Sequence, residues 1–407
     1  MGAFDEEITL LAREEGGHVL ALLAHRFGDL DLADECVQDA LLAATSWESV
    51  PANPAAWLFT VARNRAVDRL RRAAAERRRL SGASYLMTLP ETEEPDMVVE
   101  HSDVGDERLR LVLLCCHPAL DRDAQVALTL RLVGGLTTPE IAAAFLVPEA
   151  TLAQRIVRAK RKIRDARIPL SIPASLDERV AAVLTVLYLV YNEGYLSRST
   201  EGARLDLVDE AIRLTTALAS QLPDNPEVLA LLALELYGKS RSTARFAGGE
   251  LVLLDDQDRT TWDAQLIDHG NRALAAALAR DIPGPFQLQA WIASHHANAR
   301  TAADTDWPAI ASAYAQLLEL APSPVVALNH AVAVAMADGA PAGLALLDTV
   351  EGLDDYHLYW AARGELLARS GDEDAAAHAL RRARGLTANA AELRHLDRRI
   401  AALLHSP

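Results

Sequence analysis

Two adjacent thiols and an imidazole stand together in the stretch LLCCHPAL, residues 113–120 of this 407-residue chain. Such a group suits a metal site, a redox switch or a nucleophile beside its base. A zinc site needs three or four ligands, whereas the only other cysteine, Cys36, is distant in the sequence. No basic neighbour is expected to lower the pKa of the thiols, which disfavours a redox pair. We therefore predict that Cys115 and Cys116 pack as small apolar side chains and that Pro118 turns the chain into a new helix.

A second candidate is the pair His295 and His296, which follows a tryptophan in a helical stretch. Adjacent residues point about 100° apart on a helix, so the two imidazoles do not chelate one ion together. The sequence contains no phosphate-binding glycine loop, no H-E-x-x-H and no G-x-S-x-G. We expect no catalytic residue, no metal and no cofactor, and therefore no enzyme. The motif NEGY, residues 192–195, is predicted to be a helix end that organises the junction with a third domain.

The composition favours helices as the elements that carry these residues. Hydrophobic residues make up 50% of the chain but aromatic residues only 5%, which favours helix over a β-sandwich. No apolar run reaches the eighteen or so residues that a membrane span needs. The N-terminus has early acids and no basic segment before an apolar core, so we expect no signal peptide. Three cysteines form no disulfide framework, and we expect a cytoplasmic protein.

Two basic stripes interrupt an acidic chain whose formal net charge is −17. Residues 57–80 hold eight arginines against two acids, and residues 151–167 hold seven bases against one acid. This distribution favours two local contacts with a polyanion over a generally adhesive surface. The alternative for either stripe alone is a solvated helix face.

Residues 136–164, LTTPEIAAAFLVPEATLAQRIVRAKRKIR, have the pattern of a helix-turn-helix. Thr137 or Thr138 is a suitable N-cap for the first helix, and a second helix is predicted from about Pro148. Apolar residues at helical spacing predict the inner face of the second helix: Leu152, Ile156, Ala159 and Ile163. Side chains able to reach base edges and phosphates in a major groove lie outside: Thr151, Gln154, Arg158 and Arg161, with Arg155 on the flank. Any short helix pair of an all-α protein is the alternative.

Composition divides the chain into segments. Residues 1–80 and 107–168 have helical periodicity and are predicted to be two helical domains. Residues 81–106 between them are acidic, with Pro, Gly and Ser, and are predicted to be a flexible linker. Residues 177–407 are predicted to be a further helical domain.

The C-terminal segment contains two similar units that begin at Ser323 and Asp355. Each is predicted to be a helix, a glycine-containing turn and a second helix, with Gly339 and Gly371 in equivalent turns 32 residues apart. This resembles tetratricopeptide (TPR) repeats, whose period is about 34 residues. Residues 225–245 are a candidate for an earlier, divergent unit. An ordinary helical bundle is the alternative to a repeat array that binds protein.

Three stretches, in order, resemble the extracytoplasmic-function (ECF) RNA polymerase sigma factors. EIAAAFLVPEATLAQRIVRAK is similar to the region-four helix-turn-helix of that family. DLADECVQDALLAATSW, from residue 31, looks like the region-two helix that docks on polymerase. NPAAWLFTVARNRAVDRLRR, from residue 53, looks like the part of region two that opens and reads the minus-ten element. LLCCHPAL, YLVYNEGY and the helical C-terminal half resemble one ECF group with a TPR-like C-terminal extension.

The resemblance implies an all-α protein with a region-two bundle, a region-four helix-turn-helix and a TPR-like C-terminal domain. It implies core RNA polymerase and promoter DNA (minus-ten and minus-thirty-five elements) as partners, with no membrane, and a C-terminal domain that regulates activity through a protein partner or an intramolecular contact. The polymerase-binding candidates form a polar face beside a core stripe of Ala33, Val37, Ala40, Leu41 and Ala44; they are Asp34, Glu35, Gln38 and Asp39. The additional DNA-binding candidates are Asn53, Arg63, Asn64, Arg69 and Arg72, with Arg71 beside them.

Some positions depart from the family pattern. Leu146 stands where a glycine is usual in the turn, so the angle of the recognition helix is in question. Ala153 stands where a base is often found, which removes one phosphate contact. Trp47 and Trp57 are expected in the core rather than as stacking platforms for a flipped base. The alternative function is a helix-turn-helix transcriptional activator with a TPR sensor domain.

Overall fold

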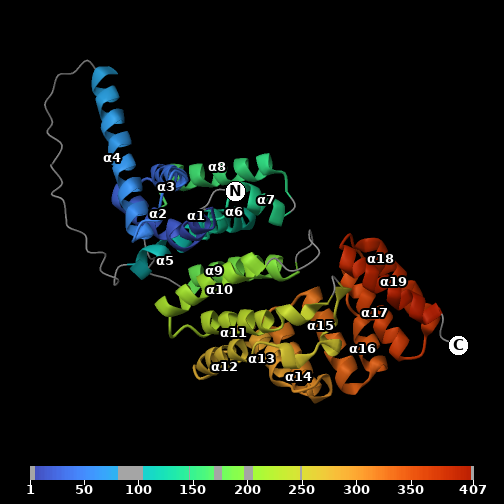
Figure 1. Cartoon of the computed structure of the whole chain (residues 1–407). Helices are drawn as coiled ribbons and strands as arrows, with labels where there is room; N and C mark the ends of the chain where they lie inside the picture. The colour runs from blue at the N-terminus through green and yellow to red at the C-terminus, as the bar shows by residue number, and fades with distance from the viewer. Residues whose placement is uncertain are drawn as a thin grey trace. The chain divides into compact units, whose positions relative to one another are not determined.

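A computed structural model of the chain describes residues 5–80, 104–145, 147–168, 177–196, 205–247 and 250–404. By its internal contacts the chain divides into two compact units, residues 1–187 and residues 188–407. Figure 1 shows that the described elements are almost all helices. The exception is a short antiparallel hairpin of β1 (Phe246–Ala247) and β2 (Glu250–Leu251). The prediction of an all-α protein is confirmed.

The N-terminal unit begins with four α-helices and one π-helix. They are α1 (Asp5–Leu11), the π-helix η1 (Ala12–Gly16), α2 (Gly17–Phe27), α3 (Leu30–Ala44) and α4 (Pro54–Leu80). Gly28 ends α2 with a left-handed φ of 66°, a conformation that glycine adopts without steric cost. Asp29 then caps α3, because its carboxylate accepts from the Leu32 N–H at 3.0 Å.

Four further α-helices of this unit follow, and the last two of them form the predicted helix-turn-helix. They are α5 (Val104–Cys115), α6 (Arg122–Leu128), which continues as the π-helix η2 (Thr129–Val133), α7 (Thr138–Ala144) and α8 (Glu149–Asp165). Thr137 is the N-cap of α7 and forms a capping box with Glu140, which confirms one of the two predicted caps. The predicted start of the second helix is also confirmed, since Pro148 is the residue before α8. Leu146 lies outside the described residues, as do residues 81–103 of the predicted linker.

The stretch LLCCHPAL forms the end of α5 and the turn before α6, with residues 113–116 buried and Pro118 exposed. Cys115 and Cys116 have no exposed surface, and the Cys116 Sγ lies 3.6 Å from the Thr129 Oγ1. Burial raises the pKa of Cys116 to about 12 and that of Cys115 well above its usual value. Contrary to the sequence prediction, each thiol has a basic residue in range, Lys160 and Arg179 respectively, but these oppose burial only in part. The prediction that the two cysteines are packing residues is confirmed.

The turn at Pro118 is held by Gln125, a residue that the sequence did not single out. Its buried amide donates to the carbonyls of Cys116, His117 and Leu120 at 3.4, 3.0 and 3.3 Å. Among the described residues, no group of three His, Cys, Asp or Glu side chains is placed to hold a metal ion. No described helix is both long enough and apolar enough to span a membrane.

One helix, α9 (Asp177–Leu196), belongs to both units, because the division falls between Leu187 and Tyr188. Its first half is part of the N-terminal unit: Val180, Val183 and Leu184 are buried, and the Arg179 guanidinium donates to the Leu113 carbonyl at 3.4 Å. Residues 169–176, which precede it, lie outside the described residues.

The C-terminal unit is a succession of helices that pack in consecutive pairs (Figure 1). They are α10 (Leu205–Gln221), α11 (Pro226–Ser240), α12 (Ala264–Leu278), α13 (Pro285–Asn298), α14 (Trp307–Leu320), α15 (Pro324–Asp338), α16 (Ala340–Leu347), α17 (His357–Arg369), α18 (Glu373–Leu386) and α19 (Ala390–Leu404). Short 3₁₀ turns join some of them: η3 (Ser242–Arg245), η4 (Leu254–Asp256), η5 (Arg259–Thr261) and η6 (Ala302–Asp304).

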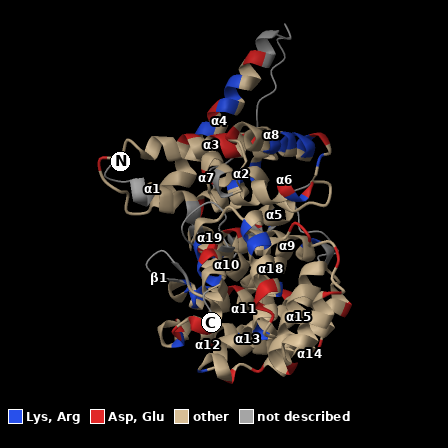
Figure 2. Ribbon diagram, turned by 90° about the vertical axis from the view of Figure 1, so that its right-hand side faces the viewer, with Lys and Arg blue, Asp and Glu red and all other residues tan. Residues whose placement is uncertain are grey.

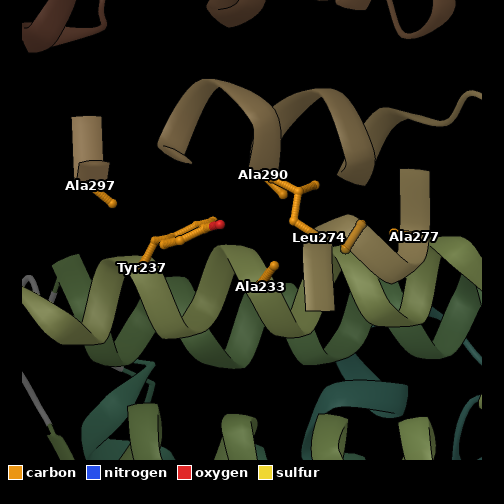
Figure 3. Close-up of a cluster of buried hydrophobic side chains, with 7 residues drawn as sticks. Ala233, Tyr237, Leu274, Ala277, Ala290 and Ala297 are labelled. Carbon is orange, nitrogen blue, oxygen red and sulfur yellow. The ribbon is translucent and has the colours of Figure 1, made fainter. Parts of the chain in front are cut away.

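Both predicted helix–turn–helix units are confirmed as pairs α15–α16 and α17–α18. Gly339 and Gly371 are in the turns with positive φ angles of 102° and 87°. The earlier candidate at residues 225–245 contains one α-helix, α11, and the 3₁₀ turn η3. The partner helix α12 begins after the intervening hairpin and further 3₁₀ turns. Small residues let these helices approach closely, as in the cluster of Ala233, Tyr237, Leu274, Ala277, Ala290 and Ala297 (Figure 3).

Candidate nucleic-acid and polymerase interface

The recognition helix α8 separates an apolar face from a basic one, as the sequence predicts. Leu152, Ile156, Ala159 and Ile163 are all buried. The predicted contact residues Thr151, Gln154, Arg158 and Arg161 are all exposed, and Arg155 is half-buried. The capping box at Thr137 fixes the start of α7, and the buried stripe fixes the rotation of α8 about its axis. One face of α8 therefore offers a hydroxyl, an amide and two guanidinium groups to solvent.

Several of these exposed side chains form ion pairs or hydrogen bonds with neighbours in the same unit. Arg155 pairs with Asp123 of α6 at 3.0 Å, and Arg161 pairs with Asp165 one turn along at 3.2 Å. The Arg158 guanidinium lies 3.4 Å from the Gln154 Oε1. Exposed pairs of this kind contribute little to stability. A polyanion such as DNA can therefore replace the carboxylates of Asp123 and Asp165 as the partner of these arginines with little loss of free energy.

The second basic stripe lies on α4, a helix that presents bases along much of its length (Figure 2). Asn64, Arg71 and Arg72 are exposed, and Arg63 is half-buried. Asn53 is the N-cap of α4, because its Oδ1 accepts from the Ala56 N–H at 3.0 Å. That bond gives Asn53 a structural role beside the role in a base pocket that the resemblance implies.

The loop before α4 is framed by two tryptophans. Trp47 and Trp57 meet edge to face with ring centroids 4.9 Å apart. Both side chains are half-buried rather than fully enclosed, so the prediction that they lie in the core is only partly right. Each indole stays partly exposed because the loop that joins α3 to α4, residues 45–53, lies at the surface.

The acidic face of α3 differs from the prediction at several positions. Asp34 is buried, with 6% of its surface exposed, although the sequence places it on a solvated polar face. Glu35 and Gln38 are exposed and Asp39 is half-buried. In the predicted core stripe, Ala33, Val37, Ala40 and Ala44 are buried but Leu41 is only half-buried. Cys36 completes the core in its place, with no exposed surface.

Bases of α4 contact this acidic face. The Arg69 guanidinium forms ion pairs with Glu35 and, at 2.7 Å, with Asp39. Arg65 reaches the same Asp39 carboxylate at 3.5 Å. A predicted DNA-binding arginine is therefore paired with two predicted polymerase-binding acids.

Bases of α8 contact the same helix from another side. The Lys160 ammonium pairs with Asp34 and, at 3.5 Å, with Asp31, and Arg164 pairs with Asp31 at 2.8 Å. Asp34 is contacted by Lys160 at one carboxylate oxygen and by the Gln38 amide, which donates to the other at 2.5 Å. In Figure 2 the acidic residues of α3 lie beside the basic residues of α8. Sequence analysis missed these pairs because the Asp34 and Lys160 positions are 126 residues apart.

Comparisons with known proteins agree with this arrangement. Residues 11–76 match the family Sigma-70 region 2, and residues 110–163 match the family Sigma-70, region 4. ECF RNA polymerase sigma factor SigL of Mycobacterium tuberculosis is 32% identical over 170 residues, which is 40% of this chain and 92% of SigL. ECF RNA polymerase sigma factor SigK of Mycobacterium ulcerans is 29% identical over 153 residues, 36% of this chain and 78% of SigK.

The chain belongs to the ECF RNA polymerase sigma factors. Members of this family act with core RNA polymerase on promoter DNA in transcription initiation. In this sigma factor α2 to α4 lie in region two and α6 to α8 in region four. The predicted family is confirmed.

The C-terminal extension has relatives of its own. Residues 179–278 match a family of unknown function, DUF6596. An uncharacterized protein of Rhizobium meliloti is 41% identical over 397 residues, 95% of this chain and 94% of that protein. The similarity to this relative therefore covers most of the chain, the C-terminal extension included.

The motif NEGY lies at the end of α9, where the sequence predicts a domain junction. The Arg245 guanidinium donates to the Tyr195 carbonyl and stacks over the Tyr195 ring, 3.9 Å from its centroid. Tyr191 packs against α11 at Gly238, where an added Cβ would come within 1.9 Å of the tyrosine oxygen. Glu235 is fully buried nearby, and burial raises its pKa well above the usual value. The contacts within the C-terminal unit thus fix the second half of α9 to α11 and η3.

The predicted histidine pair has separate partners. His295 packs against Trp291 and His296 against Trp307, with centroids 4.9 and 5.2 Å apart. Burial, with Arg241 and Arg259 nearby, lowers the pKa of His296 to about 4. His295 and Trp291 border a cavity of about 440 Å³ among α11, α12 and α13. Both imidazoles pack against tryptophans, and His295 also borders the cavity.

Proposed function

We propose that this sigma factor places α8 in the major groove of the minus-thirty-five element. The observation that carries this proposal is the exposed set Thr151, Gln154, Arg158 and Arg161 on one face of a region-four helix. Gln154 is suited to read a base edge, because its amide both donates and accepts. The arginines are suited to bind phosphates or guanine, and Arg155 contributes after it leaves Asp123.

Region two is proposed to open and hold the minus-ten element. Arg63, Asn64, Arg69 and Arg72 of α4 would follow the single strand, and Asn53 would contribute to a pocket for a flipped base. The acidic face of α3, with Asp34, Glu35, Gln38 and Asp39, would dock on a basic surface of core polymerase. We propose that the protein performs no covalent chemistry, acts in the cytoplasm and leaves polymerase after initiation.

The C-terminal domain is proposed to regulate this activity. Residues 171–407 hold 19 bases and 31 acids, a net charge of −12, which makes them a local competitor for the basic stripes of α4 and α8. The predicted TPR-like character supports a protein partner for this domain, because paired helices form extended concave binding surfaces.

Transcription with purified core polymerase tests the proposal against the activator alternative. We expect start-site-specific transcripts from genomic promoter fragments when this protein is the only sigma factor present. Arg158→Ala and Arg161→Ala together should abolish them, whereas Arg381→Ala, an exposed arginine of α18, should not. Transcripts that appear only when another sigma factor is added would favour the activator.

A further inference from the structure

We propose that two adjoining cavities in the C-terminal unit form one binding site for an arginine-containing segment of a partner protein. The arginine side chain would lie against the Trp291 indole and pair with the Asp306 carboxylate in the first cavity, while an uncharged neighbouring residue of the segment would occupy the second. The inference rests on the proposed regulation of this domain by a protein partner, and it names the chemistry by which that partner is bound.

The first observation is that the two cavities share a wall. The first cavity, of about 440 Å³, lies among α11, α12 and α13, and the second, of about 400 Å³, lies among α12, α13 and α14. Leu278 and Trp291 line both of them. Each volume is within the range of about 300–1,000 Å³ that is typical of ligand pockets. A segment that crosses Trp291 can therefore place one side chain on either side of the indole.

Large apolar side chains are exposed along this shared wall. Leu278 and Trp291 are 41% and 40% exposed, and Ile282, between α12 and α13, is 61% exposed. In contrast, Tyr237 and Leu274 form the buried side of the first cavity and belong to the packed cluster of Figure 3. Exposed apolar side chains that gather beside a cavity are characteristic of an interaction site.

The second observation is the charge of the two cavities. Asp304 and Asp306 line the first cavity and are exposed, whereas no Lys or Arg is among the described residues that line either cavity. The Arg259 guanidinium lies near Asp304 and donates to the Thr305 hydroxyl at 3.3 Å, so the Asp304 charge is compensated in part. Asp306 forms no ion pair with any residue that the structure describes. The first cavity therefore favours a cationic group.

An arginine suits this combination of groups better than a lysine does. Its planar guanidinium stacks on aromatic faces and pairs with a carboxylate through two parallel donors, whereas an ammonium group is a compact and strongly hydrated charge. Trp291 supplies the aromatic ring and Asp306 the carboxylate, and both line the same cavity. The net charge of −12 on residues 171–407 adds a longer-range attraction for a basic segment.

The third observation is a pair of asparagines whose amides are oriented by hydrogen bonds inside the first cavity. The Tyr237 hydroxyl donates to the Asn271 Oδ1 at 2.8 Å, and the amides of Asn271 and Asn298 donate to each other at 2.9 and 3.0 Å. The Asn298 amide also donates to the Ser294 carbonyl at 2.9 Å. Within the described part of the chain, one N–H of Asn271 and one lone pair of the Asn298 Oδ1 are left for a ligand. They match the carbonyl and the N–H of a peptide unit, which favours a polypeptide over a free organic cation.

Selection from a phage library of random peptides, with the full chain immobilised, tests the chemistry of the ligand. We expect the enriched peptides to contain an arginine next to an uncharged apolar residue. A synthetic peptide of the most enriched sequence should bind roughly tenfold more tightly than the same peptide with citrulline in place of that arginine, because citrulline keeps the shape and loses the charge. Failure to enrich any sequence, or enrichment of sequences without arginine, would overturn the proposal.

Two substitutions test whether the peptide occupies the first cavity. Asp306→Asn removes the charge but keeps an N-cap acceptor for α14, and it should weaken the arginine peptide roughly three- to tenfold while leaving the citrulline peptide unchanged. Trp291→Leu, which keeps an apolar side chain, should weaken the arginine peptide roughly tenfold. Asp372→Asn makes the same change at the N-cap of α18 and should affect neither peptide. Unchanged affinity of the arginine peptide for either cavity variant would show that it binds elsewhere.

A second copy of this chain is the competing occupant of the two cavities. We expect wild type and Trp291→Leu to sediment alike in analytical ultracentrifugation. If wild type sediments as a dimer and Trp291→Leu as a monomer, the surface is an interface between copies and the proposal is wrong.

Transcription with core polymerase separates this proposal from the proposed function. If the peptide binds as expected but does not change transcription by the full chain, the site stands and regulation through it is wrong. If the full chain initiates no transcription while binding responds to both substitutions, the proposed function is wrong and the site stands. If transcription initiates and no arginine peptide binds, the site is wrong and the proposed function stands.

Discussion

Gln154 is the residue of α8 with the greatest capacity to select a base. Its amide carries both a donor and an acceptor, whereas the neighbouring arginines carry donors only. Removing it should therefore change which sequences are bound more than it changes how tightly DNA is held.

We predict different outcomes for two single substitutions on this face. Gln154→Ala should relax preference at one promoter position at a cost of about 1–3 kcal/mol for the preferred base, with little change in salt dependence. Arg161→Ala should weaken binding to all sequences and lower the salt slope by about one. Competition binding with a randomised minus-thirty-five duplex, read by sequencing, checks the first; binding at several salt concentrations checks the second. Identical effects of the two substitutions would contradict these roles.

The thiols of Cys115 and Cys116 are predicted to be inert in the folded protein. Burial raises both pKa values, for Cys116 to about 12, so at pH 8 the thiolate fraction of Cys116 is roughly one in ten thousand. Because the pKa is raised, reactivity should increase only as the pH rises far above 8. Mass spectrometry after iodoacetamide treatment should find both unmodified at pH 8 in buffer and modified in denaturant. Rapid native alkylation would show that this part of region four opens.

The inner stripe of α8 could be read from sequence because Leu152, Ile156, Ala159 and Ile163 repeat at the local helical spacing. The ion pair of Asp34 with Lys160 could not, because the two residues are 126 positions apart along the chain. The role of Gln125 could not be predicted either. Its amide donates to carbonyls of the preceding turn, and no local sequence pattern links Gln125 to that turn.

Among the elements of the C-terminal unit, α15 and α16 approach each other closely at Gly343. A Cβ there would lie 2.3 Å from the Ala335 Cβ and 2.6 Å from the Ala331 carbonyl oxygen. We predict that Gly343→Ala lowers the free energy of unfolding by about 1–3 kcal/mol, as overpacking does. Urea denaturation followed by circular dichroism is the measurement.

Gly385 of α18 provides the control for this prediction. Nothing lies within 4 Å of an added Cβ at that position, and it is also inside a helix. Gly385→Ala should leave stability unchanged or raise it by up to about 1 kcal/mol. A loss of stability at Gly385 equal to that at Gly343 would mean that close packing is not the cause.

Sequence patterns located elements well where caps and turns are local. Thr137 with Glu140, and the glycines at 339 and 371, mark helix ends that the structure confirms. The π-helical turns η1 and η2 were not predictable, since they extend α-helices without a change of residue type. The interval between α11 and α12 was missed as well, because a hairpin and 3₁₀ turns separate two helices that nevertheless pack together.

At the scale of the whole molecule, the acidic C-terminal domain is predicted to compete for the basic stripes. Residues 1–187 alone should bind promoter DNA more tightly than the full chain, by roughly threefold or more at low salt, with the difference lost at high salt. The fragment must extend to Leu187, because the first half of α9 is buried in the N-terminal unit. Fluorescence anisotropy with one promoter duplex checks the comparison.

The opposite result would be equally informative about the C-terminal domain. Equal DNA binding at matched salt would reject electrostatic shielding. Transcription measured with the same fragment then shows whether the C-terminal domain inhibits initiation or is required for it. A fragment that binds DNA but initiates poorly would indicate that the domain is required.

The pair of Asp34 and Lys160 has a consequence for how relatives of this protein can diverge. A change of charge at either position leaves a desolvated partner, so single changes should be rare and double changes should restore the pair. Lineages that retain the contact between α3 and α8 should therefore exchange the two signs together. Lineages in which the two positions vary independently should have lost this contact. An alignment of relatives can therefore show which of them retain it, without an experiment on any one protein.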